Sequence, residues 1–202
     1  MTNILNQNLI SSLITHNDKV LDIGCGNGEL LYFLEDNKSI QGQGIEISHQ
    51  GVKESVSKGL SVIQGDADED LINFPDHAFD IVILSDTLQA THKPKKVLEQ
   101  MLRIGKKCII CIPNFGYWKY RLQILIYGKM PVTKTLSEPW YSTPNIHLCT
   151  IKDFINLCEH LNISINESYR NSKNNIKKIR NPKSYLNNLL STEGIFILTK
   201  EK

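Results

Sequence analysis

The segment VLDIGCGNGELL, residues 20–31, constrains the fold of this chain more than any other part of it. A short apolar run leads directly into a turn that contains Gly24, Gly26 and Gly28, and a helical pattern follows at once. Glycine adopts positive φ without strain and lets a ligand lie against bare main chain. The pattern predicts a strand, a tight turn and a helix, the arrangement with which open α/β sheets bind nucleotides. An ordinary strand-to-helix turn without a ligand is the alternative.

Acidic residues beside this turn indicate which kind of ligand it suits. Asp22 lies two residues before the first glycine, and Glu29 stands where a dinucleotide fingerprint has its third glycine. A pyrophosphate binds helix N-terminal amides and is repelled by a nearby carboxylate. We therefore expect a ligand that carries positive charge, such as the ammonium and sulfonium groups of S-adenosylmethionine (SAM).

Apolar patterns of helical and strand period alternate along the chain. This alternation predicts parallel strands joined by right-handed helical crossovers, in one α/β domain over residues 1–202. We expect a mostly parallel, seven-stranded sheet flanked by helices, with strands over residues 19–23, 40–45, 61–64, 79–84, 107–112, 163–169 and 194–199. Helices are expected over residues 4–15, 29–35 and 50–58, and after Pro94 and Thr150.

Three acidic residues fall at the ends of the first three predicted strands, where such a sheet binds its ligands. Glu46 follows Asp22 by 24 residues, the place of an acidic side chain that accepts both ribose hydroxyls. Asp66 can accept from an adenine amino group, and Ala67 beside it leaves room for the ring. Each acid alone fits a solvated loop or a helix cap, but together they favour a site for an adenosine-type ligand.

Composition excludes several classes of partner. The net charge of +2 gives no electrostatic case for nucleic acid or a membrane surface. Residues 1–10 lack the features of a signal peptide, so we expect a cytoplasmic protein. The five cysteines are odd in number, and Cys108 and Cys111 lie in one apolar strand whose alternation sends them to opposite faces. We expect core cysteines and no metal site.

An aromatic-rich insertion is predicted at about residues 115–147, after the fifth strand. It holds seven of the fifteen aromatic residues, and Trp118, Leu122 and Leu125 fit one face of a helix. Three interpretations stay open: local core, a lid over an acceptor pocket, and a docking surface. Farther along, residues 170–183 hold six basic and no acidic residues. This run is interpreted as a solvated loop between the last two strands, with a surface for an acidic partner as the alternative.

Two groups of motifs resemble known families. VLDIGCGNGELL, the acidic residue in GQGIEIS and the strand FDIVILSDTLQA resemble motifs of class I SAM-dependent methyltransferases. VIQGDADEDLINFPDHAFDIVILSDTLQATHKP and IPNFGYWKYRLQILIYGKMPVTKTLSEPWYSTPNIHLCTIKDF resemble the methionine biosynthesis protein MetW family, over roughly residues 18–165. The resemblance implies a Rossmann-like fold, SAM or S-adenosylhomocysteine as cofactor, and a role beside a homoserine O-acyltransferase of the MetX type.

The resemblance also implies site residues. Asp22, Gly24 and Gly26 would hold the methionine part, and Leu84 and Ser85 would lie near the sulfonium. The full set of expected cofactor contacts is Asp22, Gly24, Cys25, Gly26, Gly28, Glu46, Ile47, Asp66, Ala67, Leu84 and Ser85.

Two functions remain open: a SAM-binding partner of the acyltransferase, and a free-standing methyltransferase of small molecules. Ala90 stands where many small-molecule methyltransferases have a histidine, which weakens the case for a standard acceptor site. If an oxygen acceptor needs a base, His147 and then Tyr141 are the candidates; the alternative for His147, which is favoured over catalysis, is a capping or loop-packing role before the helix that starts near Thr150. DNA amino-methyltransferases have an Asn/Asp-Pro-Pro-aromatic pattern after the fourth strand, and the turn from Ser85 to Leu88 lacks it. The segment around Asn114 looks similar to that pattern but follows the fifth strand, so nucleic acid is not expected as substrate.

Overall fold

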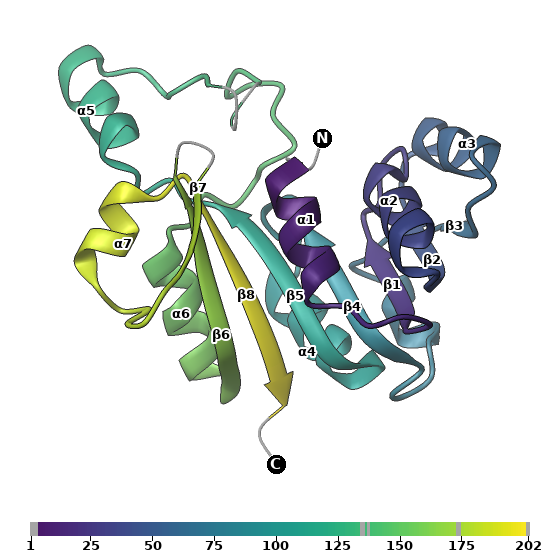
Figure 1. The fold of residues 1–202 in the computed structure, drawn as a ribbon. Helices are drawn as coiled ribbons and strands as arrows, with labels where there is room; N and C mark the ends of the chain where they lie inside the picture. The colour runs from purple at the N-terminus through teal and green to yellow at the C-terminus, as the bar shows by residue number, and fades with distance from the viewer. Residues whose placement is uncertain (1–3, 134–135, 137, 173–174, 201–202) are drawn as a thin grey trace.

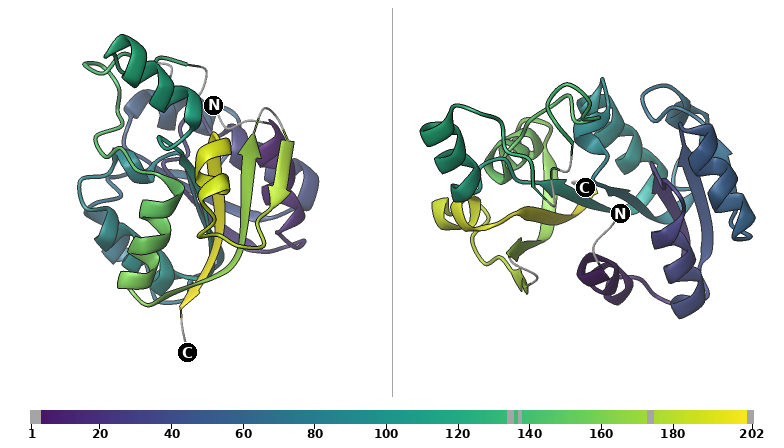
Figure 2. Two further views of the ribbon diagram at one scale, coloured as in Figure 1. Left: turned by 90° about the vertical axis from the view of Figure 1, so that its left-hand side faces the viewer. Right: turned by 90° about the horizontal axis from the view of Figure 1, so that it is seen from above.

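The computed structural model describes residues 4–133, 136, 138–172 and 175–200. Within them, eight strands form one sheet in the order β3-β2-β1-β4-β5-β8-β6-β7, with helices on both faces (Figures 1 and 2). The strands are β1 (Lys19–Ile23), β2 (Gln41–Glu46), β3 (Val62–Gln64), β4 (Phe79–Ser85), β5 (Gly105–Pro113), β6 (Ile163–Ser172), β7 (Asn175–Lys178) and β8 (Glu193–Lys200). The α-helices are α1 (Ile4–Ser12), α2 (Glu29–Lys38), α3 (His49–Ser57), α4 (Pro94–Ile104), α5 (Trp118–Tyr127), α6 (Ile151–His160) and α7 (Tyr185–Leu190), and the 3-10 helices are η1 (Asp70–Asn73) and η2 (Leu88–Ala90).

The sheet has the predicted parallel part and one strand more than predicted. Strands β1 to β5 pair in parallel, whereas β8 lies antiparallel to both β5 and β6. The extra strand, β7, falls in the basic run, so the interpretation of residues 170–183 as a solvated loop was wrong. β6 continues to Ser172, and its last residues pair with β7. These residues are mostly polar, so cross-strand pairing and not an apolar pattern makes them strands.

Two apolar cores lie on opposite faces of the sheet. Helices α1 and α2 contribute to one core, and α4 and α6 contribute to the other. Cys108 packs in the core of α4 and α6, and Cys111 packs in the other. Both thiols are fully buried, which raises their pKa above the ordinary value. The prediction of two core cysteines on opposite faces is therefore confirmed.

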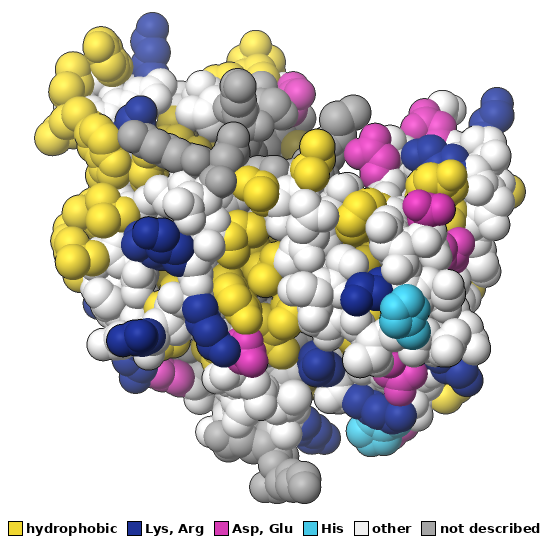
Figure 3. Space-filling model, in the orientation of Figure 1, with side chains coloured by type: hydrophobic (Ala, Val, Ile, Leu, Met, Phe, Trp, Pro, Cys, Tyr) yellow, Lys and Arg dark blue, Asp and Glu magenta, His cyan; other side chains and the backbone are white. Residues whose placement is uncertain are grey.

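The insertion after β5 is only partly packed. Tyr117, Tyr120 and Leu136 form a small third core, with Phe115 against it. The predicted helix exists as α5, but Leu125 on its expected face is 81% exposed. Apolar side chains accordingly cover the surface around α5 (Figure 3). Of the three interpretations of the insertion, a local core therefore explains the residues around Tyr117 and Tyr120 and does not explain the exposed residues of α5.

No helix in the described ranges is both long and apolar enough to span a bilayer.

Candidate functional site

The glycine turn joins β1 to α2 at the carboxyl edge of the parallel strands. All three glycines have positive φ: 70° at Gly24, 57° at Gly26 and 76° at Gly28. The Gly24 amide donates to the Ile45 carbonyl at 2.8 Å, which fixes the turn against β2. A Cβ at Gly28 would lie 2.4 Å from Leu60 Cδ1, whereas a Cβ at Gly26 would meet nothing within 4 Å. Gly28 is thus required by packing, and Gly26 faces open space.

This difference predicts unequal costs for two alanine substitutions. Gly26→Ala is expected to lower the free energy of unfolding by about 1–2 kcal/mol, the cost of a left-handed backbone. Gly28→Ala carries that cost plus the overlap with Leu60, and we expect a further loss of roughly 1–3 kcal/mol. Denaturant unfolding of both variants measures the difference. Equal losses would contradict the packing role of Gly28.

Two cavities flank the turn. The first has a volume of about 200 Å³ and is lined by Asp22, Gly24, Cys25, Asn27, Glu29, Leu30, Ser85, Asp86 and Thr87. The second has a volume of about 160 Å³ and is lined by Gly24, Ile45, Ile47, Gly65, Asp66, Ala67, Asp68, Thr87, Ala90, Thr91 and His92. Gly24 and Thr87 line both. The Thr87 side chain lies 2.6 Å from the Cβ position of Gly24, so these two residues mark the boundary between the cavities.

Asp22 is the most perturbed carboxyl group at the turn. It is the penultimate residue of β1, is only 2% exposed and lines the first cavity. Burial, and secondarily the charge of Glu46, raises its pKa to about 7. A buried carboxylate is costly without a cationic partner. The first cavity therefore favours a ligand that places positive charge beside Asp22.

Glu46 has a structural role that was not predicted from the sequence. One carboxylate oxygen accepts from the Gly26 amide and the other from the Ser48 amide, each at 2.8 Å. The carboxylate thereby joins the glycine turn to the end of β2 and the start of α3. A carboxylate oxygen has more than one lone pair, so these bonds leave Glu46 able to accept from a ligand.

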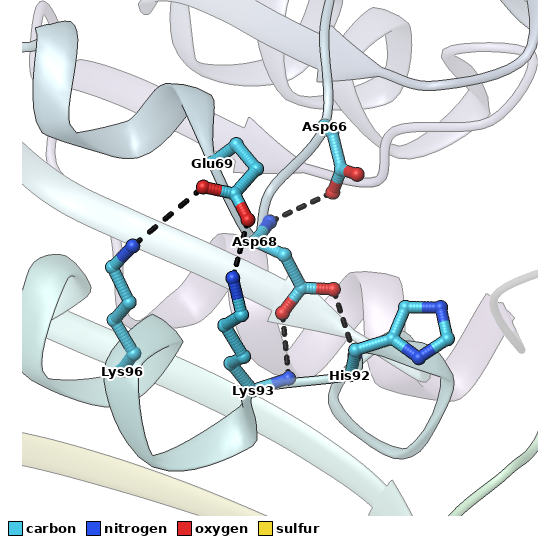
Figure 4. Close-up of polar contacts among 6 residues, drawn as sticks. All are labelled: Asp66, Asp68, Glu69, His92, Lys93 and Lys96. Carbon is cyan, nitrogen blue, oxygen red and sulfur yellow. Dashed lines mark hydrogen bonds and ion pairs between the residues drawn. The ribbon is translucent and has the colours of Figure 1, made fainter.

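Asp66 and Asp68 organise the wall of the second cavity (Figure 4). Asp66 accepts from the Asp68 amide at 2.8 Å. Asp68 is 7% exposed and accepts from the amides of His92 and Lys93, each at 2.7 Å. Glu69 pairs with Lys93 and, at 3.8 Å, with Lys96. These contacts hold the loop after β3 against the start of α4.

Asp86 is a cavity residue that sequence reasoning missed. It follows β4 with φ of 53°, an uncommon conformation for a residue other than glycine. The side chain is exposed to the first cavity, yet protein surrounds it on most sides, and burial followed by the charge of Glu193 raises its pKa to about 7. Glu193 itself accepts from Asn6 and Asn171, each at 3.0 Å. The signal available in the sequence was an acidic residue directly after the fourth strand.

The structure brings seven of the eleven expected cofactor residues to the cavities. Asp22, Gly24, Cys25, Ile47, Asp66, Ala67 and Ser85 line one or both. Gly26, Gly28, Glu46 and Leu84 do not; Leu84 is fully buried in the core of α4 and α6. The two acid–base candidates, His147 and Tyr141, are exposed and line neither cavity. The amide of His147 donates to the Gln89 carbonyl at 2.9 Å, which anchors the end of the insertion to η2.

These residues fit a SAM molecule in chemical terms. Among the described residues no cation acts on Asp22, so the ammonium group would supply one, and Gly26 leaves space against bare backbone. The second cavity combines Ile47 and Ala67 with the Asp66 carboxylate, which suits the flat face and the amino edge of an adenine.

Solved structures share this fold. A SAM-dependent methyltransferase of Thermotoga maritima, described as a possible histamine N-methyltransferase, superimposes with a TM-score of 0.71 at 15% identity, covering 98% of this chain and 89% of that one. The [4+2]-cyclase SpnF superimposes with a TM-score of 0.68 at 16% identity, covering 96% and 80%. The fold is thus the Rossmann-like fold of SAM-dependent methyltransferases, and it also serves a cyclase.

Curated relatives are larger proteins. The bifunctional methionine biosynthesis protein MetXA/MetW of Rhodopirellula baltica is 35% identical over 167 residues, which are 78% of this chain and 27% of that protein. Ajmaline N-methyltransferase of Rauvolfia serpentina is 31% identical over 94 residues, 43% of this chain and 32% of that enzyme. This chain spans between a quarter and a third of their lengths. The family model described as methionine biosynthesis protein MetW matches residues 5–198, and the chain therefore belongs to the MetW family.

Proposed function

We propose that this protein binds SAM in the two cavities at the glycine turn and acts with a MetX-type homoserine O-acyltransferase in methionine biosynthesis. The observation that carries the partnership is the relative in which a MetW region shares one chain with a MetXA region. Two activities fused in one protein are commonly those of components that act together. The cavities and their carboxylates support the SAM site.

The proposed cofactor contacts divide between the cavities. Asp22, Gly24 and Cys25 would hold the methionine part, with Gly26 and Gly28 shaping the turn. Ile47, Asp66 and Ala67 would hold the adenine, and Glu46 would accept from the ribose. Leu84 and Ser85 would lie near the sulfonium. SAM would supply an electrophilic methyl group, or act as a signal of the end of the pathway.

Calorimetry with SAM, followed by assay of the acyltransferase, tests the proposal. We expect saturable binding of one SAM per chain, co-purification with the MetX-type acyltransferase of the same organism, and a change in acyltransferase activity when this protein is added. Absence of binding to the acyltransferase together with unchanged activity would refute the partnership. Absence of SAM binding would refute the assigned site.

The affinity for SAM is expected to depend on pH through Asp22. The pKa of about 7 in the free protein means that acid protonates this carboxyl, and a cationic ligand binds the carboxylate form. Affinity is therefore full well above pH 7, is about half of that at pH 7, and falls by roughly tenfold between pH 7.5 and pH 6. Calorimetry at both pH values measures the change. A pH-independent affinity would contradict contact between Asp22 and the cation.

A free-standing methyltransferase of small molecules is the second candidate function. Asp86 favours it, because a carboxyl with a pKa of about 7 beside the first cavity can take up a proton at neutral pH. His147 and Tyr141 remain candidates for the same role from the insertion. Under this function, Asp86→Asn would keep SAM binding and lose turnover. A SAM-bound protein that turns over with no metabolite in a broad screen would count against it.

A further inference from the structure

An unusually apolar surface covers α5 and α7. The two helices lie side by side at one end of the molecule (Figure 1), and the guanidinium of Arg121 lies 5.8 Å from the ring centre of Tyr185. Figure 3 shows apolar side chains covering both. We call this region the α5–α7 surface; its exposed apolar residues are Leu122, Ile124, Leu125, Ile126 and Tyr127 of α5 and Tyr185, Leu186 and Leu190 of α7. A contiguous apolar surface of this kind is typical of a protein interface.

A cavity with two cations adjoins the α5–α7 surface. Its volume is about 300 Å³, and its lining residues are Tyr117, Trp118, Arg170, Ser172, Asn175, Lys177 and Leu190. Arg170 and Lys177 stand directly opposite each other in the β6–β7 pair. Like charges in that position destabilise an antiparallel pair. Because both cations line one cavity, an anion bound there would reduce their repulsion.

Two neighbouring cations, unlike Arg170 and Lys177, form ion pairs with residues that the structure describes. Lys178 pairs with Glu167 at 3.0 Å, and Lys183 pairs with Glu159 at 2.6 Å. Among the residues that the structure describes, neither Arg170 nor Lys177 has an ion-pair partner. Arg170 is also half-buried, so water solvates it incompletely. A carboxylate between these two cations would remove their repulsion.

We propose that the α5–α7 surface, with its cationic cavity, is the docking site for the MetX-type acyltransferase. This proposal rests on the proposed function and names the surface that performs it. The acyltransferase would place apolar side chains against α5 and α7 and insert an Asp or Glu carboxylate between Arg170 and Lys177. Trp118 at the cavity is 39% exposed and is of the type that dominates binding at interfaces.

The choice of the acyltransferase as the partner at this surface rests on the fused relative and on the charge of the cavity. In the fused relative, which is described as MetXA/MetW, the region that matches this chain is 27% of the protein, and a MetXA region shares the molecule with it. A second copy of this chain suits the surface less well. A symmetric dimer pairs the same patch with itself, which would bring two cationic cavities together.

Two matched sets of variants test the proposal by calorimetry against the purified MetX-type acyltransferase of the same organism. Leu125→Glu places a charge at the most exposed apolar residue of α5. Ile72→Glu is its control, because that side chain is 63% exposed and lies on η1, which packs against α4. The double variant Arg170→Glu/Lys177→Glu reverses the cavity charge. Its control, Lys53→Glu/Lys95→Glu, makes the same change in net charge on α3 and α4.

We expect each test variant to weaken acyltransferase binding at least tenfold and each control to change it less than twofold. Binding of the unmodified protein should also weaken with added salt, and that dependence should shrink in the cavity double variant. Circular dichroism and SAM affinity, both unchanged, would show that the variants fold. Leu186→Glu on α7 gives an independent test if Leu125→Glu does not fold.

The possible outcomes separate this proposal from the proposed function. If the unmodified protein binds the acyltransferase and the test variants bind equally well, the surface is wrong and the partnership stands. If the unmodified protein does not bind, both fail. Self-association that Leu125→Glu abolishes, without an effect on acyltransferase binding, would make the surface a contact between copies of this chain and overturn the proposal.

Discussion

Asp22→Asn is expected to stabilise the ligand-free protein at pH 8 and to remove its affinity for SAM. Burial raises the pKa of Asp22 from 3.8 to about 7, so at pH 8 the folded protein holds a carboxylate that its surroundings disfavour. The unfolded chain loses this proton near pH 4, so the destabilisation grows between pH 4 and pH 7 and is complete above that range. The asparagine removes it, and we expect a gain on the order of 2–4 kcal/mol at pH 8.

Denaturant unfolding at pH 8 and pH 5 measures this effect. The gain should be less than roughly half as large at pH 5, where Asp22 is protonated in the folded protein and mostly ionised in the unfolded chain. Asp36→Asn on α2 is the control, because that side chain is exposed and its loss should change neither stability nor binding. A destabilised Asp22→Asn protein at pH 8, or one that binds SAM normally, would refute the role given to this carboxyl group.

Asn114→Ala is expected to lower the free energy of unfolding by roughly 4 kcal/mol, at about 1 kcal/mol for each backbone group that it leaves unpaired. Asn114 is fully buried. Its amide nitrogen donates to the carbonyls of Asn188 and Ser191, both at 2.7 Å. Its oxygen accepts from the amides of Gly116 at 3.0 Å and Ile151 at 3.2 Å. One side chain thus connects the end of β5 to the insertion, α6 and α7.

The same substitution is expected to weaken acyltransferase binding, since Asn114 connects the segments that carry α5 and α7. Asn114→Asp keeps the two accepted bonds but buries a carboxylate whose second oxygen faces the carbonyl oxygens of Asn188 and Ser191, so at neutral pH it should lose at least as much stability as the alanine variant. Asn37→Ala is the control: that exposed side chain makes one bond, to the Phe33 carbonyl at 2.8 Å, and its loss should cost less than 1 kcal/mol, as for a surface substitution. A loss below 1 kcal/mol in Asn114→Ala would contradict the connecting role.

The sequence predicted the parallel half of the fold well. Strands β4 and β5 carry continuous apolar runs, and β1 is apolar apart from Lys19 and Asp22. The glycine turn depends on the positive φ of its own glycines, so the strands and the turn can all be predicted from neighbouring residues. The sequence failed where strands form through pairing alone. β7 has a polar sequence and exists because β6 extends beside it, and the short helix α7 was not predicted.

The candidate site divides in the same way. Residue types and spacing are enough to place Asp22, Glu46 and Asp66 at one edge of the sheet. Asp86 was missed as a cavity residue although it directly follows the fourth predicted strand, and Asn114 was considered only for a DNA methyltransferase motif, for which it follows the wrong strand. Both residues act through contacts with segments more than seventy residues away in the chain.

The sequence by itself determined the glycine turn, the acidic residues around it and the family, because these depend on local backbone conformation and on residue identity. Only the tertiary structure decided how those groups behave. Burial raises the pKa of Asp22, two backbone amides engage Glu46, and a cross-strand register sets Arg170 opposite Lys177. Solvation, hydrogen bonding and charge pairing depend on which distant segments meet, and that is settled only when the chain is folded.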